Sequence, residues 1–160
     1  MLRKALIVFA CLGLIHCSVF RHKAADVVFS EMNHGLYQTQ NEDVLASDSA
    51  MATDSIHYKF LEQVDTIPAL TGTSFGMEYK VTSTSAKEVT LKRVWVFPYP
   101  MKDKKGRRYE RWENKMRVSV NETHFTYYKF VKHYELLKGK WKLQFYQGDK
   151  LIYERAFIVK

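Results

Sequence analysis

The sequence predicts an all-β fold, built as a sandwich of two antiparallel sheets and preceded by an N-terminal signal helix. The first reason is composition: ten Tyr, ten Phe and three Trp favour half-buried, pleated surfaces over helices. The second is that apolar and polar residues alternate with a period of two through most of the chain after residue 54. No amphipathic helix follows the first seventeen residues, so a layered β structure is the expected class.

Residues 1–17 have the layout of a secretory signal peptide. Arg3 and Lys4 precede an apolar run, residues 5–15, that is too short to span a bilayer. We therefore expect an exported protein, either periplasmic or secreted. Conventional cleavage near Cys17 is one outcome. Lipidation of Cys17 is another, although His16 before it is not small, and an uncleaved anchor is the third.

Cysteine usage supports the same setting. Cys11 and Cys17 both lie in the signal region, so the rest of the chain cannot form an intramolecular disulfide. An exported domain without disulfides fits a bacterial periplasm better than a eukaryotic extracellular space. The expected location is therefore the bacterial cell envelope.

The chain after the signal divides into two parts. Residues 18–54 form an N-terminal segment, with an extended piece at 27–38 and a polar loop at 41–54. Residues 55–160 form the β-sandwich domain. Its first strand is expected within 56–64, where Tyr58 and Phe60 share one parity.

The next strands follow in order. Alternation is cleanest at 75–81, which predicts a strand with one buried face. Residues 89–96 form the third, in which Val89 and Leu91 lie on one parity and Val94 and Val96 on the other. This switch indicates either a bulge or a strand buried on both faces.

The remaining strands are expected at 116–120, 125–131, 141–146 and 151–159, with a tight turn at 147–150. Six or seven strands of this kind are typical of an immunoglobulin-like sandwich. Trp141, Phe75 and Tyr79 are expected in its core. The missing cysteine pair excludes only the disulfide-bearing form of that architecture.

Three motifs resemble a bacterial family known only as a domain of unknown function. They are Gly35-Leu36-Tyr37, then Thr66-Ile67-Pro68-Ala69 with Gly72, Phe75-Gly76 and Tyr79, and finally Glu135-Leu136 with Gly139-Lys140-Trp141. The similarity spans about residues 27–159. It implies an immunoglobulin-like β-sandwich, and it carries over no catalytic or binding residue.

The strongest local feature for function is a basic segment, residues 102–111, after Pro98 and Pro100. Two interpretations are open. The segment is either a solvated inter-strand loop kept charged for solubility, or an anion-binding finger with Tyr99, Tyr109 and Trp112 available for stacking. The candidate binding residues are Lys102, Lys104, Lys105, Arg107, Arg108 and Arg111.

The net charge of +8 suits an anionic partner such as lipid or polysaccharide, or an envelope protein with an acidic surface. Nucleic acid is a poor candidate, because export removes the protein from it and no nucleic-acid-binding motif is present.

No catalytic residues, cofactor or metal are predicted. The histidines lack metal-site spacing, and no nucleophile elbow or phosphate-binding loop is present. The expected function is therefore non-enzymatic binding. Two alternatives stay open: a periplasmic hydrolase with a site assembled only in the fold, for example around His133 and Glu135, and an envelope assembly factor that acts by strand addition.

Overall fold

The computed structural model describes residues 26–39 and 58–160. The predicted signal peptide, Cys17 and the predicted polar loop at 41–54 all lie outside the described residues. Within the described ranges, no helix is both long and apolar enough to cross a membrane.

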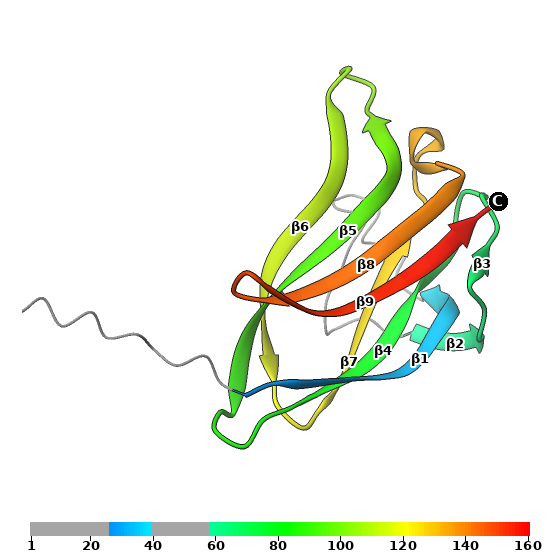
Figure 1. The fold of residues 1–160 in the computed structure, drawn as a ribbon. Helices are drawn as coiled ribbons and strands as arrows, with labels where there is room; N and C mark the ends of the chain where they lie inside the picture. Colours follow the sequence, from blue (N-terminus) through cyan, green and yellow to red (C-terminus); the bar gives the residue numbers. More distant parts are fainter. Residues whose placement is uncertain (1–25, 40–57) are drawn as a thin grey trace, which may run out of the picture.

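The described residues form two facing sheets (Figure 1). One sheet has the strand order β2-β1-β4-β7, and the other has the order β3-β9-β8-β5-β6. Within the described residues the strand pairs are antiparallel, except the short β3–β9 pair, which is parallel. The predicted all-β sandwich is confirmed. The strands are β1 (Val28–Thr39), β2 (Tyr58–Glu62), β3 (Thr66–Ile67), β4 (Ser74–Thr82), β5 (Glu88–Lys102), β6 (Arg108–Ser119), β7 (Thr123–Lys129), β8 (Gly139–Gln147) and β9 (Lys150–Val159), with a 3-10 turn η2 (His133–Glu135).

The extended piece before residue 55 is part of the sandwich. β1 lies between β2 and β4, and its pairing with β4 runs from Val28 opposite Thr82 to Tyr37 opposite Ser74. The sandwich therefore includes residues that precede the predicted boundary between residues 54 and 55. β1 supplies an inner strand of one sheet.

The change of parity in β5 has a simple cause. The ladder between β5 and β6 is regular from Glu88 to Val96, so there is no bulge at the switch. Instead Arg93 occupies an inward position and is only 1% exposed, while Val94 on the opposite face is also buried. A strand buried on both faces, one of the two alternatives, is what the structure contains.

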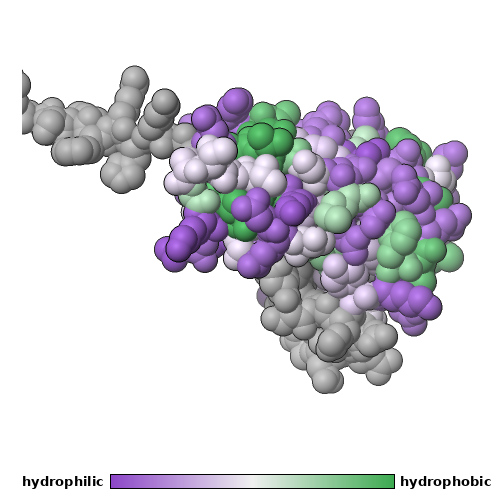
Figure 2. All heavy atoms as spheres, turned by 90° about the horizontal axis from the view of Figure 1, so that it is seen from below, coloured by the Kyte–Doolittle hydropathy of each residue, from purple (hydrophilic) through white to green (hydrophobic). Residues whose placement is uncertain are grey.

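The surface is mixed in character. Seen from below, hydrophobic residues form separate small patches among hydrophilic ones (Figure 2). On the described part of that face, no broad apolar patch offers an obvious partner interface.

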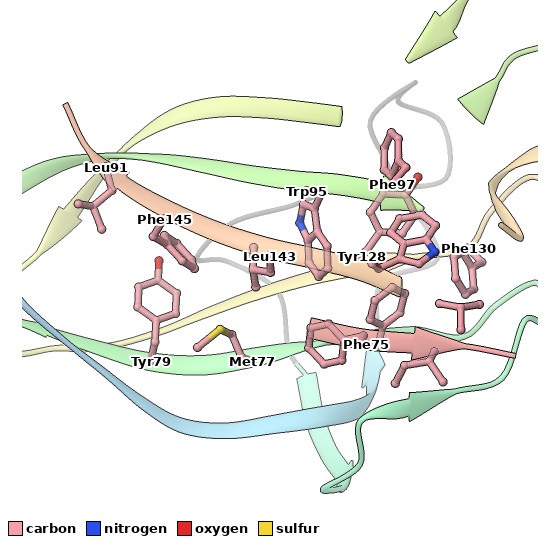
Figure 3. Packing of buried hydrophobic residues seen from close by; sticks show 14 of the residues in the cluster. Phe75, Met77, Tyr79, Leu91, Trp95, Phe97, Tyr128, Phe130, Leu143 and Phe145 are labelled. Atoms are coloured by element: carbon pink, nitrogen blue, oxygen red, sulfur yellow. The ribbon is translucent and has the colours of Figure 1, made fainter. Parts of the chain in front are cut away.

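The core fills the space between the sheets with aromatic side chains (Figure 3). Phe75 of β4 points toward Trp95 of β5, and Tyr79 of β4 points toward Phe145 of β8, so both lie on the inner face of their strand as alternation requires. Phe75 meets Trp95 edge-to-face at 5.4 Å between ring centroids, and it meets Trp141 at 5.8 Å. The predicted core positions Phe75, Tyr79 and Trp141 are all fully buried.

The Glu-Leu and Gly-x-Trp residues of the third motif build the corner between β7 and β8. One oxygen of Glu135 accepts hydrogen bonds from the backbone N–H groups of Val131 (2.6 Å) and Lys132 (2.7 Å). The indole of Trp141 donates to the carbonyl oxygen of Leu137 at 2.7 Å. The motif thus stabilises a turn and anchors the start of a strand.

Candidate functional site

The basic segment is a β-hairpin rather than a long loop. β5 continues to Lys102 and β6 begins at Arg108, so only residues 103–107 turn the chain. Arg108 and Arg111 therefore lie in a strand. Figure 1 shows the end of this hairpin projecting beyond the rest of the sandwich.

Asp103 orders the hairpin tip. Its Oδ1 accepts hydrogen bonds from the backbone N–H groups of Lys105 and Arg107, both at 2.9 Å. Gly106 adopts φ +80°, a conformation that glycine reaches without a steric penalty, and its N–H donates to the carbonyl oxygen of Asp103 at 3.0 Å. The cations of the tip are therefore presented by a defined turn.

Asp103 also neutralises one of those cations. Its Oδ2 lies 2.7 Å from Nε of Arg107. Desolvation pushes the pKa of the Asp103 carboxyl upward, but the hydrogen bonds from Arg107 and Lys105 outweigh it, so the pKa is lowered. Arg111 is likewise paired, 3.3 Å from Glu113.

Four of the six predicted binding residues remain available to bind an anion. Within the described residues none of the four forms an ion pair, and all are exposed: Lys102, Lys104, Lys105 and Arg108. Lys102 pairs directly with Arg108 across the hairpin. Like charges in directly opposite positions destabilise a sheet, so the tip carries a cost that an anion would relieve.

A bulge sets the angle of the hairpin. The register passes from Val96 opposite Arg111 to Met101 opposite Tyr109, so residues 97–100 face the single residue Glu110. Pro98 and Pro100 lie in this bulge, where their missing N–H groups cost no ladder hydrogen bond. The bulge also carries the predicted stacking residue Tyr99, which is 51% exposed. Such a feature re-aims side chains at the end of a strand pair.

The residues named for a hydrolase do not form a reactive pair. Glu135 is buried, and its carboxylate holds the two backbone N–H groups of the β7–β8 corner. Burial raises the pKa of that carboxyl, and the two backbone hydrogen bonds lower it only in part. His133, in contrast, is exposed. Glu135 therefore has a structural task.

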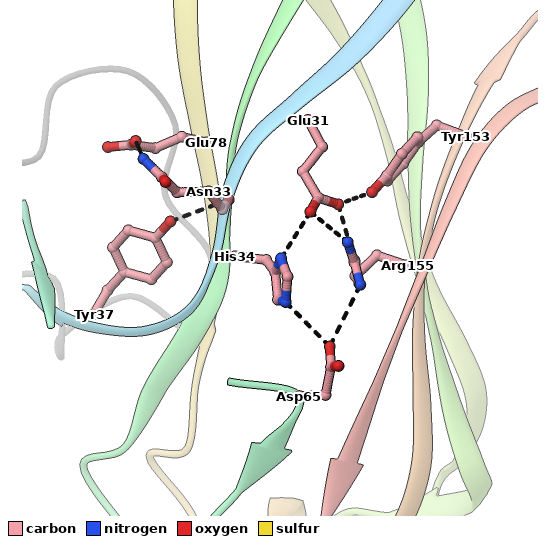
Figure 4. Close-up of polar contacts among 8 residues, drawn as sticks. All are labelled: Glu31, Asn33, His34, Tyr37, Asp65, Glu78, Tyr153 and Arg155. Carbon is pink, nitrogen blue, oxygen red and sulfur yellow. Dashed lines mark hydrogen bonds and ion pairs between the residues drawn. The ribbon is translucent and has the colours of Figure 1, made fainter. Parts of the chain in front are cut away.

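A polar cluster that the sequence did not reveal joins the two sheets (Figure 4). Glu31 of β1 accepts hydrogen bonds from Arg155 and from the hydroxyl of Tyr153, both on β9. Nδ1 of His34 lies 2.7 Å from Glu31, and Nε2 lies 3.2 Å from Asp65. Both nitrogens face carboxylates, so both donate only when the ring carries two protons.

The cluster escaped sequence analysis because of a β-bulge. The register of β1 on β4 shifts between Glu31 and Asn33, so one residue is inserted there. In a regular strand Glu31 and His34 would face opposite sides, and the insertion brings them together. Since each ring nitrogen of His34 is already engaged, the arrangement ties the sheets together and leaves no free base.

Two open hollows lie on the described surface. One, of about 370 Å³, is lined by Lys129 and by nine residues that include neither an acid nor a histidine: Leu36, Tyr37, Gln38, Thr39, Leu61, Pro68, Gly72, Thr73 and Ser74. Another, of about 620 Å³, lies where Lys87 and Glu88 meet Asn121 and Glu122. Nowhere in residues 26–39 and 58–160 do three metal-ligating side chains gather.

β6 is an edge strand, paired only with β5 within its sheet. Its outward side chains include charges of both signs, at Arg111, Glu113, Lys115 and Arg117. Charged side chains on an edge oppose pairing with another chain. The edge therefore does not favour strand addition.

Comparison with known proteins agrees with the architecture. No curated protein matches the chain. Among solved structures, the chain is similar to an immunoglobulin-like protein from Pseudomonas aeruginosa, with a TM-score of 0.64 and 24% sequence identity. The match covers 86% of this chain and 98% of that one. The family model described as Domain of unknown function (DUF3859) matches residues 26–159, and the chain belongs to that family.

Proposed function

We propose that this protein is an exported, non-enzymatic binding domain of the bacterial cell envelope that engages an anionic partner through the β5–β6 hairpin. The observation that carries the proposal is the tip itself. Two exposed lysines lie in a turn that Asp103 holds in place, and two more exposed cations, Lys102 and Arg108, lie directly opposite one another on the strands that flank it. Arg108 supplies a planar fork suited to carboxylate or phosphate, and the lysines supply point charges.

Non-enzymatic binding is supported by the structural contacts of two polar groups that could otherwise act as a base. Glu135 holds backbone N–H groups, and His34 has a carboxylate at each ring nitrogen. One oxygen of Glu135 and both ring nitrogens of His34 are therefore engaged in structural contacts, which disfavours either group as a general base, since that role needs a free lone pair within reach of a substrate proton.

The test compares the full chain with two variants that lose equal charge. The hairpin variant is Lys102→Thr, Lys104→Ser, Lys105→Ser and Arg108→Thr, and the control variant is Lys59→Thr, Lys80→Thr, Lys87→Thr and Lys160→Ser. Binding is measured to anionic vesicles and to polygalacturonate at several salt concentrations. We expect the hairpin variant to lose at least about tenfold in affinity for one of these probes.

The control variant should retain binding, because its substitutions lie away from the tip. Equal losses in both variants would mean that only net charge matters, and the hairpin would not be the site. Export is tested separately by the intact mass of the protein from its native host. A species shortened near residue 17 supports it, whereas a full-length species in the cytosol contradicts it.

A further inference from the structure

The outer face of the β3-β9-β8-β5-β6 sheet extends the basic surface beyond the hairpin. Core residues such as Leu91, Trp95 and Leu143 point inward, so their strand neighbours point outward. Six of these outward positions are cationic and three are acidic. We call this surface the basic face; its cations are Lys92, Arg111, Lys115, Arg117, Lys140 and Lys142, and its acids are Glu88, Glu113 and Glu154.

The charges on the basic face are arranged in rows across the strands. Lys92 lies directly opposite Lys115 on one side and Tyr146 on the other, and its ammonium sits 4.8 Å from the centre of the Tyr146 ring. In a second row, Arg111 and Lys142 flank Val96, and each forms an ion pair with an acid of the neighbouring row: Arg111 with Glu113 at 3.3 Å and Lys142 with Glu154 at 3.1 Å. The two rows are four residues apart along β5, which corresponds to roughly 13 Å.

The row between them is acidic and polar. Glu113 lies opposite Val94, and Gln144 lies beside Glu154, whose Oε2 accepts a hydrogen bond from the Gln144 amide at 2.6 Å. Paired with Arg111 and Lys142, these carboxylates leave the middle of the face without net positive charge, so a ligand with closely spaced negative charges gains no attraction there. They would accept hydrogen bonds from hydroxyl groups.

We infer that the partner of the hairpin is an extended acidic polysaccharide that also lies across the basic face. Its acidic groups would meet Lys92, Lys115 and Arg117, and its hydroxyl groups would meet Gln144 and the carboxylates of the middle row. A phosphate backbone or an anionic membrane presents negative charge without such polar gaps, so the acidic row disfavours both. This inference rests on the proposed function, because the hairpin tip begins the same surface.

The test uses galacturonate oligomers of increasing length with the full chain. The face variant is Lys115→Thr with Arg117→Thr, which removes two exposed cations from β6. Its matched control is Lys59→Thr with Lys87→Thr, which removes two cations outside the face. Single-stranded oligothymidylate and anionic vesicles serve as the comparison ligands.

We expect affinity to rise with oligomer length, because a short oligomer reaches the tip or the face but not both. The face variant should lose about tenfold in affinity for long oligomers and little for short ones. The control should match the wild type. Oligothymidylate and vesicles should bind more weakly than an oligomer of equal charge.

The failures are distinguishable. Loss of binding in the hairpin variant with none in the face variant would overturn the extended site and leave the proposed function standing. No loss in the hairpin variant would overturn the proposed function itself. Tighter binding to oligothymidylate or vesicles than to the oligomers would overturn the assignment to a polysaccharide.

Discussion

The guanidinium of Arg155 binds both carboxylate oxygens of Glu31, and this pair joins a strand of one sheet to a strand of the other. Nε of Arg155 lies 2.9 Å from Oε2, and its second nitrogen contacts Oε1. Bidentate pairs of this kind have fixed geometry and are stronger than single hydrogen bonds. The side chains are 27% and 17% exposed, so the pair is partly shielded from water.

Replacing Arg155 with leucine should destabilise the fold by about 2 kcal/mol, because a half-buried carboxylate loses its main partner. Arg155→Lys keeps the charge but not the fork, so a smaller loss is expected. The control is Lys142→Ala, which breaks the more exposed pair with Glu154 and should cost less than about 1 kcal/mol. Urea unfolding measures all three, and equal losses for Arg155→Leu and Lys142→Ala would contradict the tie between the sheets.

Two buried tryptophans give a matched pair of substitutions. Trp141 and Trp95 are both fully buried, but only Trp141 has a hydrogen-bond partner for its indole N–H within the described residues. Trp141→Phe should therefore cost about 1–2 kcal/mol more than Trp95→Phe in the free energy of unfolding, since it alone removes a bond. Chemical denaturation of both variants checks this, and the reverse order would refute it.

Glu135 gives a pH-dependent prediction. Its pKa is raised in the folded state from an ordinary value of 4.5, chiefly by burial, so the fold binds a proton that the unfolded chain releases. Stability linked to this group therefore falls as pH rises from about 4.5 through the folded pKa. Glu135→Gln removes that linkage, and its stability relative to wild type should improve between pH 4 and pH 7.

The matched variant at this position is Glu135→Ala, which leaves the N–H groups of Val131 and Lys132 without an acceptor. It should cost about 1–3 kcal/mol at every pH. Thermal unfolding across the pH range separates the two effects. A flat difference between wild type and Glu135→Gln would contradict the raised pKa.

Gly76 is required by the close approach of β4 and β7. A Cβ atom at this position would lie 2.0 Å from the carbonyl oxygen of Thr126, which is a backbone atom that a rotamer change cannot move. Gly76→Ala should therefore cost about 3 kcal/mol or prevent folding. Gly148→Ala, in the open β8–β9 turn, has no atom within 4 Å and should cost only about 1 kcal/mol. Circular dichroism and urea unfolding test the contrast.

The sequence predicts those parts of the fold where alternation is unbroken. Residues 75–81 and 141–146 fall within β4 and β8, and Trp141 lies in the core as expected. Alternation fails where a polar side chain takes an inward position, as at Arg93, whose guanidinium donates to Thr126 at 2.6 Å across the sandwich. A pattern based on hydrophobicity cannot identify such a position, because its partner lies on a distant strand.

The candidate site is predicted less completely. Charge alone indicates the basic segment, but not that Arg107 is neutralised by Asp103, since that contact depends on the geometry of the turn. The rows of the basic face are also hidden from the sequence. Lys92, Lys115 and Tyr146 become neighbours only through the register of three strands.

The inner position of β1 has a consequence for how the chain folds. β1 precedes its partner β4 by about forty residues, and its contact between Glu31 and Arg155 spans 124 residues. Contacts of such long range form slowly, because loop closure must precede any gain from pairing. The contact between β1 and β9 therefore cannot form until the last strand of the chain is present. The nascent chain cannot complete the sandwich until β9 has been synthesised, which makes closure of the two sheets a late, post-translational event.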